Sequence, residues 1–241
     1  MVCLNIALIF AGGTGQRMNA RSLPKQFLEL HGKPVIFYTL EHFEKHPEID
    51  AVVIVCLKEW IGELKKLLAR YGFEKIRHIV PGGNTGYASI YNGLAAMTDD
   101  FGNEDIVLIH DGVRPLINEA LISSNIAKVK ERGNAITAEP VAESIVESKS
   151  GELIDAIPRR ENMYMAKAPQ SFRYGMIWGL YQQAERDGKR SIDSAHLCSL
   201  YDVPLYMVES APNNIKITAP QDYYIFRALY EAYENQQILG V

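Results

Sequence analysis

The chain has 241 residues, of which 47% are hydrophobic and 22% are charged, a balance typical of a globular protein with a substantial core. Its net charge of −4 argues against a nucleic-acid-binding surface, which would need an excess of basic residues. The three cysteines lie far apart and form no Cys-x-x-Cys pair, which suits free thiols in a reducing cytoplasm. There is no signal-peptide pattern and no apolar run of membrane-spanning length, so we expect a cytoplasmic protein without a membrane partner.

Short apolar runs alternate with helical segments along the chain. This pattern predicts βαβ units and a doubly wound, mostly parallel, Rossmann-like α/β sheet with helices on both faces. Strands are expected at residues 6–11, 51–57, 78–81, 106–110 and 215–218. Helices are expected at residues 34–46, 59–71, 88–97, 175–184 and 220–234. Because no repeat, low-complexity tract or linker interrupts the chain, residues 1–241 are expected to form one folding unit.

The alternation of strands and helices is interrupted after the fourth expected strand. Residues 144–148 and 153–157 flank the turn-forming sequence Lys149-Ser150-Gly151-Glu152, which predicts a β-hairpin. The hairpin would protrude from the sheet as an arm at about residues 140–168. Its apolar side chains would be exposed to solvent in a single chain, and a second subunit could bury them. We therefore expect a homodimer.

The most informative segment begins where the first expected strand ends. The run Leu8-Ile9-Phe10 leads into a glycine-rich loop that ends at Met18, and a lysine follows at position 25. Glycines let backbone N–H groups close on an anion, while Arg17 and Lys25 bring positive charge to the same place. The loop lacks the Walker pattern, and Met18 stands where the dinucleotide pattern needs its third glycine. A polyphosphate cradle outside these two patterns is therefore predicted.

Three more polar segments fall at the ends of expected strands, where open α/β sheets bind their ligands. They are Gly82-Gly83-Asn84-Thr85-Gly86 leading to Ser89, His110-Asp111-Gly112-Val113-Arg114-Pro115, and Asn213-Asn214-Ile215-Lys216-Ile217-Thr218. Each segment alone is as readily a turn, a helix cap or a solvated lysine. Together they predict one ligand site. His42 and His46, four residues apart on an expected helix, lack the intervening glutamate of zinc proteases and are interpreted as a solvated face.

These segments, with Leu-Pro-Lys-Gln-Phe-Leu-Glu-Leu and Ala-Pro-Gln-Ser-Phe, resemble the sugar-alcohol-phosphate cytidylyltransferases. The resemblance runs in order and in spacing from about residue 6 to residue 230. Two branches are close: ribitol-5-phosphate cytidylyltransferase and 2-C-methyl-D-erythritol 4-phosphate cytidylyltransferase. It implies a single nucleotidyltransferase domain over 1–241, with an arm for dimerisation and substrate binding at about 140–168.

The implied reaction joins CTP, the co-substrate, to a small polyol phosphate. The acceptor phosphate oxygen attacks the α-phosphorus in line, and pyrophosphate leaves. Because this nucleophile is already anionic at neutral pH, the protein need not supply a base. Its task is to bring two anions together and to stabilise the developing charge with cations, loop amides and Mg²⁺.

The resemblance also assigns roles by position. The catalytic residues would be Arg17, Lys25, Arg160 and Lys216. The CTP-binding residues would be Phe10, Ala11, Gly12, Gly13, Gly82, Gly83, Asn84, Ser89 and Gly112. The acceptor would contact Asp111, Arg114, Ser144, Arg160 and Lys216, and Asp111 would also help to hold Mg²⁺. Arg160 would come from the arm of the partner subunit, and spacing alone does not separate it from its neighbour Arg159.

Three positions depart from the family pattern. Gly86 stands where an arginine is usual, Gly112 where alanine or serine is usual, and Ala168 where threonine is usual. A missing hydroxyl at position 168 removes one hydrogen bond to a charged phosphate, worth roughly 1.5–3 kcal/mol. These departures bear on the identity of the acceptor and leave nucleotidyl transfer in place.

Four interpretations follow. The first is a ribitol 5-phosphate enzyme for wall teichoic acid or capsule polymers, favoured by the sequence at residues 25–28 and 146–148. The second is the methylerythritol enzyme of isoprenoid synthesis. A catalytically inactive nucleotide-binding module is a third interpretation, with Gly86 as its support. A nicotinamide oxidoreductase is the fourth, and the missing third glycine counts against it.

Overall fold

The computed structural model describes residues 3–12 and 23–239. Two predicted site residues, Gly13 and Arg17, lie outside the described residues. Among the residues described, no helix combines the length and apolarity that a membrane crossing demands.

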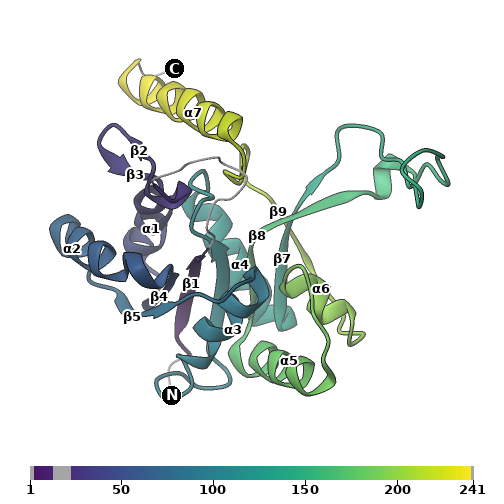
Figure 1. The fold of residues 1–241 in the computed structure, drawn as a ribbon, viewed down its shortest axis with the longest axis horizontal. Coiled ribbons are helices and arrows are strands. Elements are labelled where there is room, and N and C mark those ends of the chain that lie inside the picture. Colours follow the sequence, from purple (N-terminus) through teal and green to yellow (C-terminus); the bar gives the residue numbers. More distant parts are fainter. Residues whose placement is uncertain (1–2, 13–22, 240–241) are drawn as a thin grey trace.

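A seven-stranded sheet forms the centre of the molecule (Figure 1). Its strands are β1 (Asn5–Ala11), β4 (Ala51–Cys56), β5 (Ile76–Pro81), β6 (Ile106–Asp111), β7 (Asn134–Pro140), β8 (Tyr164–Arg173) and β9 (Met207–Glu209). They lie in the order β5-β4-β1-β6-β8-β7-β9. β1 is parallel to β4 and β6, whereas β8 is antiparallel to β6 and β7. The predicted mostly parallel sheet is confirmed.

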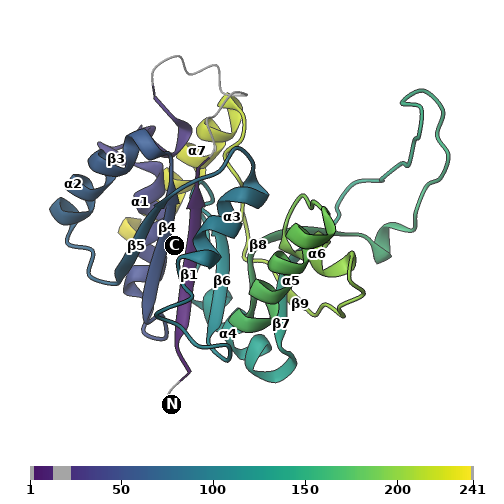
Figure 2. The ribbon, with the colours of Figure 1, turned by 60° about the horizontal axis from the view of Figure 1, so that its bottom comes forward.

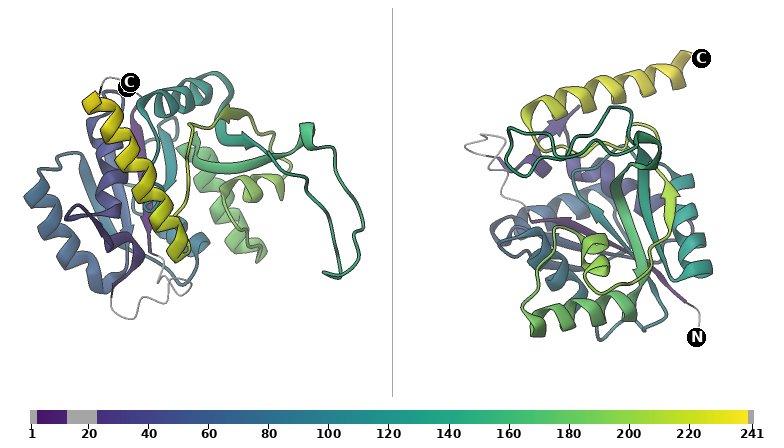
Figure 3. Two further views of the ribbon diagram at one scale, coloured as in Figure 1. Left: turned by 90° about the horizontal axis from the view of Figure 1, so that it is seen from above. Right: turned by 90° about the vertical axis from the view of Figure 1, so that its right-hand side faces the viewer.

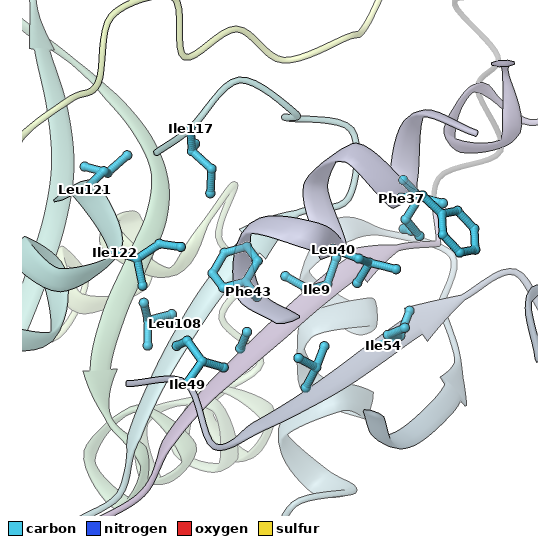
Figure 4. Close-up of a cluster of buried hydrophobic side chains, with 14 of the residues drawn as sticks. Ile9, Phe37, Leu40, Phe43, Ile49, Ile54, Leu108, Ile117, Leu121 and Ile122 are labelled. Atoms are coloured by element: carbon cyan, nitrogen blue, oxygen red, sulfur yellow. The ribbon is translucent and has the colours of Figure 1, made fainter. Parts of the chain in front are cut away.

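Helices cover both faces of the sheet (Figure 2). One face packs against α1 (Val35–Lys45), α2 (Ile61–Tyr71) and α4 (Glu119–Arg132), and the other against α3 (Gly86–Ala95), α5 (Tyr174–Asp187) and α6 (Ser194–Ser199). The alternation of side chains in β1 explains the two layers, since Ala7 and Ile9 enter one core while Leu8 enters the other. Figure 4 shows the first core, where Ile9 and Leu108 of the sheet meet Leu40 and Phe43 of α1.

Short elements and one long helix complete the chain. The 3-10 helices are η2 (Lys25–Phe27), η3 (Lys58–Trp60) and η4 (Arg160–Asn162), and a small hairpin joins β2 (Glu29–Leu30) to β3 (Lys33–Pro34). Helix α7 (Pro220–Leu239) packs through Phe226 on Tyr38 of α1. Side-chain caps fix where helices begin: the Thr85 hydroxyl accepts the Ala88 N–H at 3.1 Å, and Asn118 Oδ1 accepts the Leu121 N–H at 2.9 Å.

The expected strand at residues 215–218 is wrong. This segment crosses the end of the sheet without joining a ladder, and the Ile217 N–H donates to Val113 O at 2.9 Å. Its apolar residues are buried for another reason. Ile217 is fully buried in a third core with Leu30, Val35 and Phe226, under α7.

The arm protrudes as predicted, although its pairing differs from the prediction. β7 and β8 pair up to Pro140 and Tyr164, and residues 141–163 extend from this stalk (Figures 1 and 3). Within the extension, the bridge between Glu147 and Ala156 replaces the two expected strands. The backbone near the tip is held instead by side chains, for example by Asp155 Oδ2, which accepts the Lys149 N–H at 2.6 Å.

Candidate active site

The predicted site lies where the strand order reverses. The chain runs from β1 outward to β4 and β5, and then returns to place β6 on the other side of β1. Phe10 of β1 is in register with Asp111 of β6, so the loops that follow these two strands open at the same edge. Such a switch point is where doubly wound sheets bind ligands.

Two glycines bring the predicted nucleotide-binding segments after β1 and β5 into contact. A Cβ at Gly12 would stand 2.9 Å from Ser89 Oγ and 3.2 Å from the Gly82 Cα, so the chain after β1 touches the chain after β5. The Ser89 hydroxyl accepts the Gly83 N–H at 3.1 Å and ties that loop to α3. Asn84 is exposed in the same loop. The predicted residues thus line two adjoining segments, in which Gly12 is buried, Gly82 and Gly83 are half-buried and Asn84 is exposed.

Gly112 closes the same edge from the β6 side. Its N–H donates to Phe10 O at 3.0 Å, and a Cβ at this position would stand 2.9 Å from the Ala11 Cβ. The residue after β6 is therefore packed closely against the end of β1. This contact gives a steric reason for glycine at a position where the family usually has a small side chain.

A buried ion cluster stands beside these loops. Asp111 Oδ1 lies 2.6 Å from Lys216 Nζ, and Asp111 Oδ2 lies 3.2 Å from Arg114 Nε. The side chains of Asp111 and Arg114 are 6% and 9% exposed, whereas that of Lys216 is 39% exposed. Two cations thus share one carboxylate, which leaves a net positive charge, and only the lysine reaches solvent appreciably.

The electrostatic balance keeps this carboxylate ionised. Burial alone would raise the pKa of Asp111, but Lys216 and Arg114 outweigh that effect and hold the pKa below its usual value. Lys216 Nζ also lies 5.8 Å from the centre of the Phe10 ring, on the strand that carries the first loop. The cluster is therefore a fixed positive centre directed at the edge where the loops open.

Lys25 connects the first loop to the segment that carries Lys216. It lies in η2, and its Nζ donates to Ile217 O at 2.9 Å. The adjacent Gln26 is fully buried and donates to Ala11 O at 2.7 Å. Lys25 and Lys216, two of the predicted catalytic residues, are thus brought to the same crossing segment.

His110 stabilises the backbone turn that carries Asp111 and Arg114, a role that the sequence did not reveal. It is fully buried, and its Nε2 lies 3.1 Å from Arg114 O. Burial lowers the pKa of His110 to about 3, so the ring is neutral at pH 7. Because a carbonyl can only accept, the Nε2–H donates and holds the backbone turn from Asp111 to Arg114.

The two predicted site residues of the arm are not part of this cluster within one chain. Ser144 and Arg160 are exposed on the extension, which projects away from the sheet (Figures 1 and 3). Arg160 Nη1 donates to Ala142 O at 3.1 Å, and the neighbouring Arg159 pairs with Glu161 at 3.1 Å. Their predicted roles therefore require a second subunit.

The residues described contain no group of three or more His, Cys, Asp or Glu side chains placed to hold a metal ion.

The prediction that His42 and His46 form a solvated face is wrong. His46 is 2% exposed and lies 3.0 Å from Ser123 Oγ, while His42 Nε2 lies 3.0 Å from Pro115 O. Both histidines tie α1 to the segment that follows β6.

Comparison with known proteins agrees with this geometry. Residues 5–232 match the family model described as 2-C-methyl-D-erythritol 4-phosphate cytidylyltransferase. Over 238 residues the chain is 45% identical to a ribitol-5-phosphate cytidylyltransferase of Vibrio parahaemolyticus, covering 98% of this chain and 100% of the relative. It is 34% identical over 228 residues to a 2-C-methyl-D-erythritol 4-phosphate cytidylyltransferase of Clostridium botulinum, covering 94% and 97%.

The fold is likewise that of a solved relative. The crystal structure of 4-diphosphocytidyl-2C-methyl-D-erythritol synthase from Anaerococcus prevotii matches with a TM-score of 0.82 and 27% identity, covering 95% of this chain and 96% of that one. The family model, the near-complete relatives and the ion cluster at the switch point agree with the resemblance in the motifs. The chain therefore belongs to the sugar-alcohol-phosphate cytidylyltransferases.

Proposed function

We propose that this protein transfers CMP from CTP to D-ribitol 5-phosphate, giving CDP-ribitol and pyrophosphate. One observation favours this acceptor over methylerythritol 4-phosphate. The ribitol-5-phosphate relative is 45% identical across the whole chain, against 34% for the methylerythritol relative. A product of this kind would serve wall teichoic acid or capsule synthesis.

The cation cluster supports the proposed chemistry. Lys216 and Arg114 are fixed on Asp111, and Lys25 is held at the next segment. Preorganised cations of this kind can bind two phosphates close together and stabilise negative charge that develops at the α-phosphorus. No general base is required because the acceptor phosphate is already ionised. In this proposal Lys216, the most exposed of the cluster, contacts the acceptor.

The cluster also fits a magnesium ion bound mainly by the nucleotide. Mg²⁺ in nucleotide sites is commonly held by one or two carboxylates together with substrate phosphates and water. Asp111 supplies an ionised carboxylate at the cluster, and each of its oxygens has a second lone pair beyond its cation partner. A bound ion would supply charge neutralisation at the phosphates. Asp111 would hold it while keeping Lys216 oriented.

The arm supports a homodimer. Its side chains include apolar groups that the chain itself leaves exposed, with Leu153 at 70% and Ile157 at 66%. Burying such a patch against a second subunit is favourable, at roughly 25 cal/mol per Å² of apolar surface. The partner's arm would then bring Arg160 and Ser144 to this chain's cluster. Residues 1–241 would act as one nucleotidyltransferase domain, with the arm as its dimerisation element.

Two other interpretations have weaker support. Gly86 is the argument for an inactive nucleotide-binding module, yet Lys25, Asp111, Arg114 and Lys216 are all present and interconnected. Methylerythritol 4-phosphate remains the alternative acceptor.

The cytoplasm is the proposed location, since Cys3, Cys56 and Cys198 are all free thiols.

Product analysis tests the proposal. The purified protein is incubated with CTP and Mg²⁺ and with either ribitol 5-phosphate or methylerythritol 4-phosphate, and the nucleotide products are identified by mass spectrometry. CDP-ribitol is the expected product. CDP-methylerythritol formed to the exclusion of CDP-ribitol would replace the proposed acceptor, and the absence of both products would contradict catalysis with these acceptors.

A further inference from the structure

Asn214 links three parts of the molecule at the base of the ion cluster. It is 1% exposed, in the segment between β9 and α7. Its Nδ2 donates to Ala168 O of β8 at 2.8 Å and to Ser210 Oγ at 3.1 Å. Its backbone carbonyl accepts a hydrogen bond from Arg114 Nη1 at 2.9 Å. One buried residue therefore joins the strand that leads from the arm to the cation next to Asp111.

Lys216 lies in the short stretch that follows Asn214, and that stretch is also fixed at its other end. The Ile217 N–H donates to Val113 O, and the Ile217 carbonyl accepts from Lys25, both at 2.9 Å. Ile217 itself is fully buried. Backbone contacts and burial secure that end, whereas at the other end the link to β8 comes from the side-chain amide of Asn214. The placement of the lysine backbone therefore depends on this amide together with the Asn214 carbonyl, which accepts from Arg114.

The local backbone conformation makes the dependence stronger. Asn213 has a φ of +59°, and its carbonyl accepts the Ile215 N–H at 2.6 Å, so the chain turns sharply around Asn214. This turn lets the Asn214 carbonyl meet Arg114 while Lys216, two residues later, meets Asp111. If the amide lost its hold on Ala168, both cations would shift relative to the carboxylate.

We propose that Asn214 is a positioning residue for nucleotidyl transfer, acting through Lys216 and Arg114. The inference rests on the proposed function, because it assumes that the cluster stabilises phosphate charge in the transition state. Such stabilisation depends on exact placement, and misplacement by about 1 Å can cost about 100-fold in rate. Asn214 contacts Arg114 directly and precedes Lys216 by two residues in the chain.

A matched pair of substitutions tests the inference. Asn214→Asp keeps the size of the side chain but removes the N–H that donates to Ala168 O. Asn103→Asp makes the same chemical change on an exposed side chain in the loop before β6. We expect Asn214→Asp to lower kcat at least about 10-fold, with the KM for CTP changed by less than about 3-fold, as for loss of a transition-state interaction. Asn103→Asp is expected to stay close to wild type.

A double-mutant cycle separates positioning from a general structural effect. If Asn214 acts in part through Lys216, then Asn214→Asp should lower the single-turnover rate by a clearly smaller factor in a Lys216→Ala background than in the wild-type background, because residues that act as a unit are non-additive. Equal losses in the two backgrounds would overturn the inference. Urea unfolding of each variant checks the fold, and Asn214→Ser, which keeps a shorter donor, replaces Asn214→Asp if the latter does not fold.

The outcomes also distinguish this inference from the proposed function. The assays use whichever acceptor the wild-type protein converts. A wild-type protein without cytidylyltransferase activity would contradict the proposed function. An active wild-type protein whose kcat is unchanged by Asn214→Asp would overturn the positioning role alone.

Discussion

The ammonium group of Lys216 lies 2.6 Å from Oδ1 of Asp111, across the edge of the sheet between the end of β6 and the segment that precedes α7. The carboxylate of Asp111 is buried and the side chain of Lys216 is partly exposed, so the carboxylate holds the ammonium group in place while the lysine faces solvent. A buried charge is stable when it is paired, and here the pairing also fixes where the positive charge sits.

Removal of the Lys216 charge should impair turnover more than folding. We expect Lys216→Ala to lower kcat by a factor of about 10²–10³, the size seen when one preorganised charge-stabilising group is lost. Lys130→Ala is the matched control, because Lys130 is an exposed lysine that pairs with Glu48 at 3.4 Å on the surface. Steady-state pyrophosphate release measures both variants. Unchanged turnover in Lys216→Ala would remove this residue from the catalytic machinery.

The glycine loop after β5 should tolerate a methyl group at one position and not at another. A Cβ at Gly83 would stand 2.4 Å from the Ala88 Cβ, whereas a Cβ at Gly86 meets nothing within 4 Å. We expect Gly83→Ala to lower the free energy of unfolding by about 1–3 kcal/mol, the usual cost of overpacking, and to weaken CTP binding. Gly86→Ala, in the first turn of α3, should leave both close to wild type.

Urea unfolding and calorimetric titration with CTP measure the two variants side by side. Equal stability and equal CTP affinity in Gly83→Ala and Gly86→Ala would contradict the proposed close packing of this loop on α3.

His110 should make the folded protein sensitive to acid. Its pKa is about 3 in the folded protein and about 6.5 in the unfolded chain, so between these values only the unfolded state binds the proton. The free energy of unfolding should therefore fall as pH drops below about 6.5, by up to about 1.4 kcal/mol per pH unit from this residue. His42, whose pKa burial also lowers, acts in the same direction.

His110→Gln keeps a donor for Arg114 O but cannot titrate. We expect urea unfolding at pH 7.0, 5.5 and 4.5 to show a shallower loss of stability in this variant than in wild type. Parallel slopes in the two proteins would contradict the assignment of the acid sensitivity to His110.

Catalysis should be shared between subunits. If the partner's arm supplies Arg160, then a mixture of inactive Arg160→Ala and inactive Lys25→Ala subunits should regain activity, because some dimers then contain one intact site. Arg159→Ala in place of Arg160→Ala identifies which of the two arginines is required. Failure to recover activity, after native mass spectrometry has demonstrated subunit exchange, would mean that each site is built from one chain.

The hydrophobic pattern of the sequence was sufficient for the centre of the sheet and failed towards β7 and β8. β1 and β6 are continuous apolar runs, and their positions were predicted closely. β7 and β8 bury polar residues instead: Ser171 Oγ donates to Asn125 Oδ1 at 2.9 Å, and Asn125 Nδ2 donates to Thr137 Oγ1 at 3.1 Å. From the sequence, these polar side chains would be expected to face solvent, and only the tertiary fold supplies their partners. The strands β7 and β8 therefore could not be recognised from hydrophobic periodicity.

In the site, too, the sequence predicted some residues and missed others. Glycine-rich and charged segments at strand ends predicted Lys25, Asp111, Arg114 and Lys216, and the structure brings all four to one edge. His110 and Asn214 stand in two of these segments, but the sequence assigned neither of them a role. His110 hydrogen-bonds to the backbone of Arg114, four residues later, and Asn214 hydrogen-bonds to Ala168 of the distant strand β8. Both bonds are buried and are defined only by the folded chain.

The ratio of kcat/KM for ribitol 5-phosphate to that for methylerythritol 4-phosphate, measured with CTP and Mg²⁺ by pyrophosphate release, is the most direct test of the proposed acceptor. We predict a ratio well above about 100, a preference of about 3 kcal/mol in transition-state binding. A ratio below one would contradict the proposed acceptor and would assign the cation cluster around Asp111 to the methylerythritol reaction.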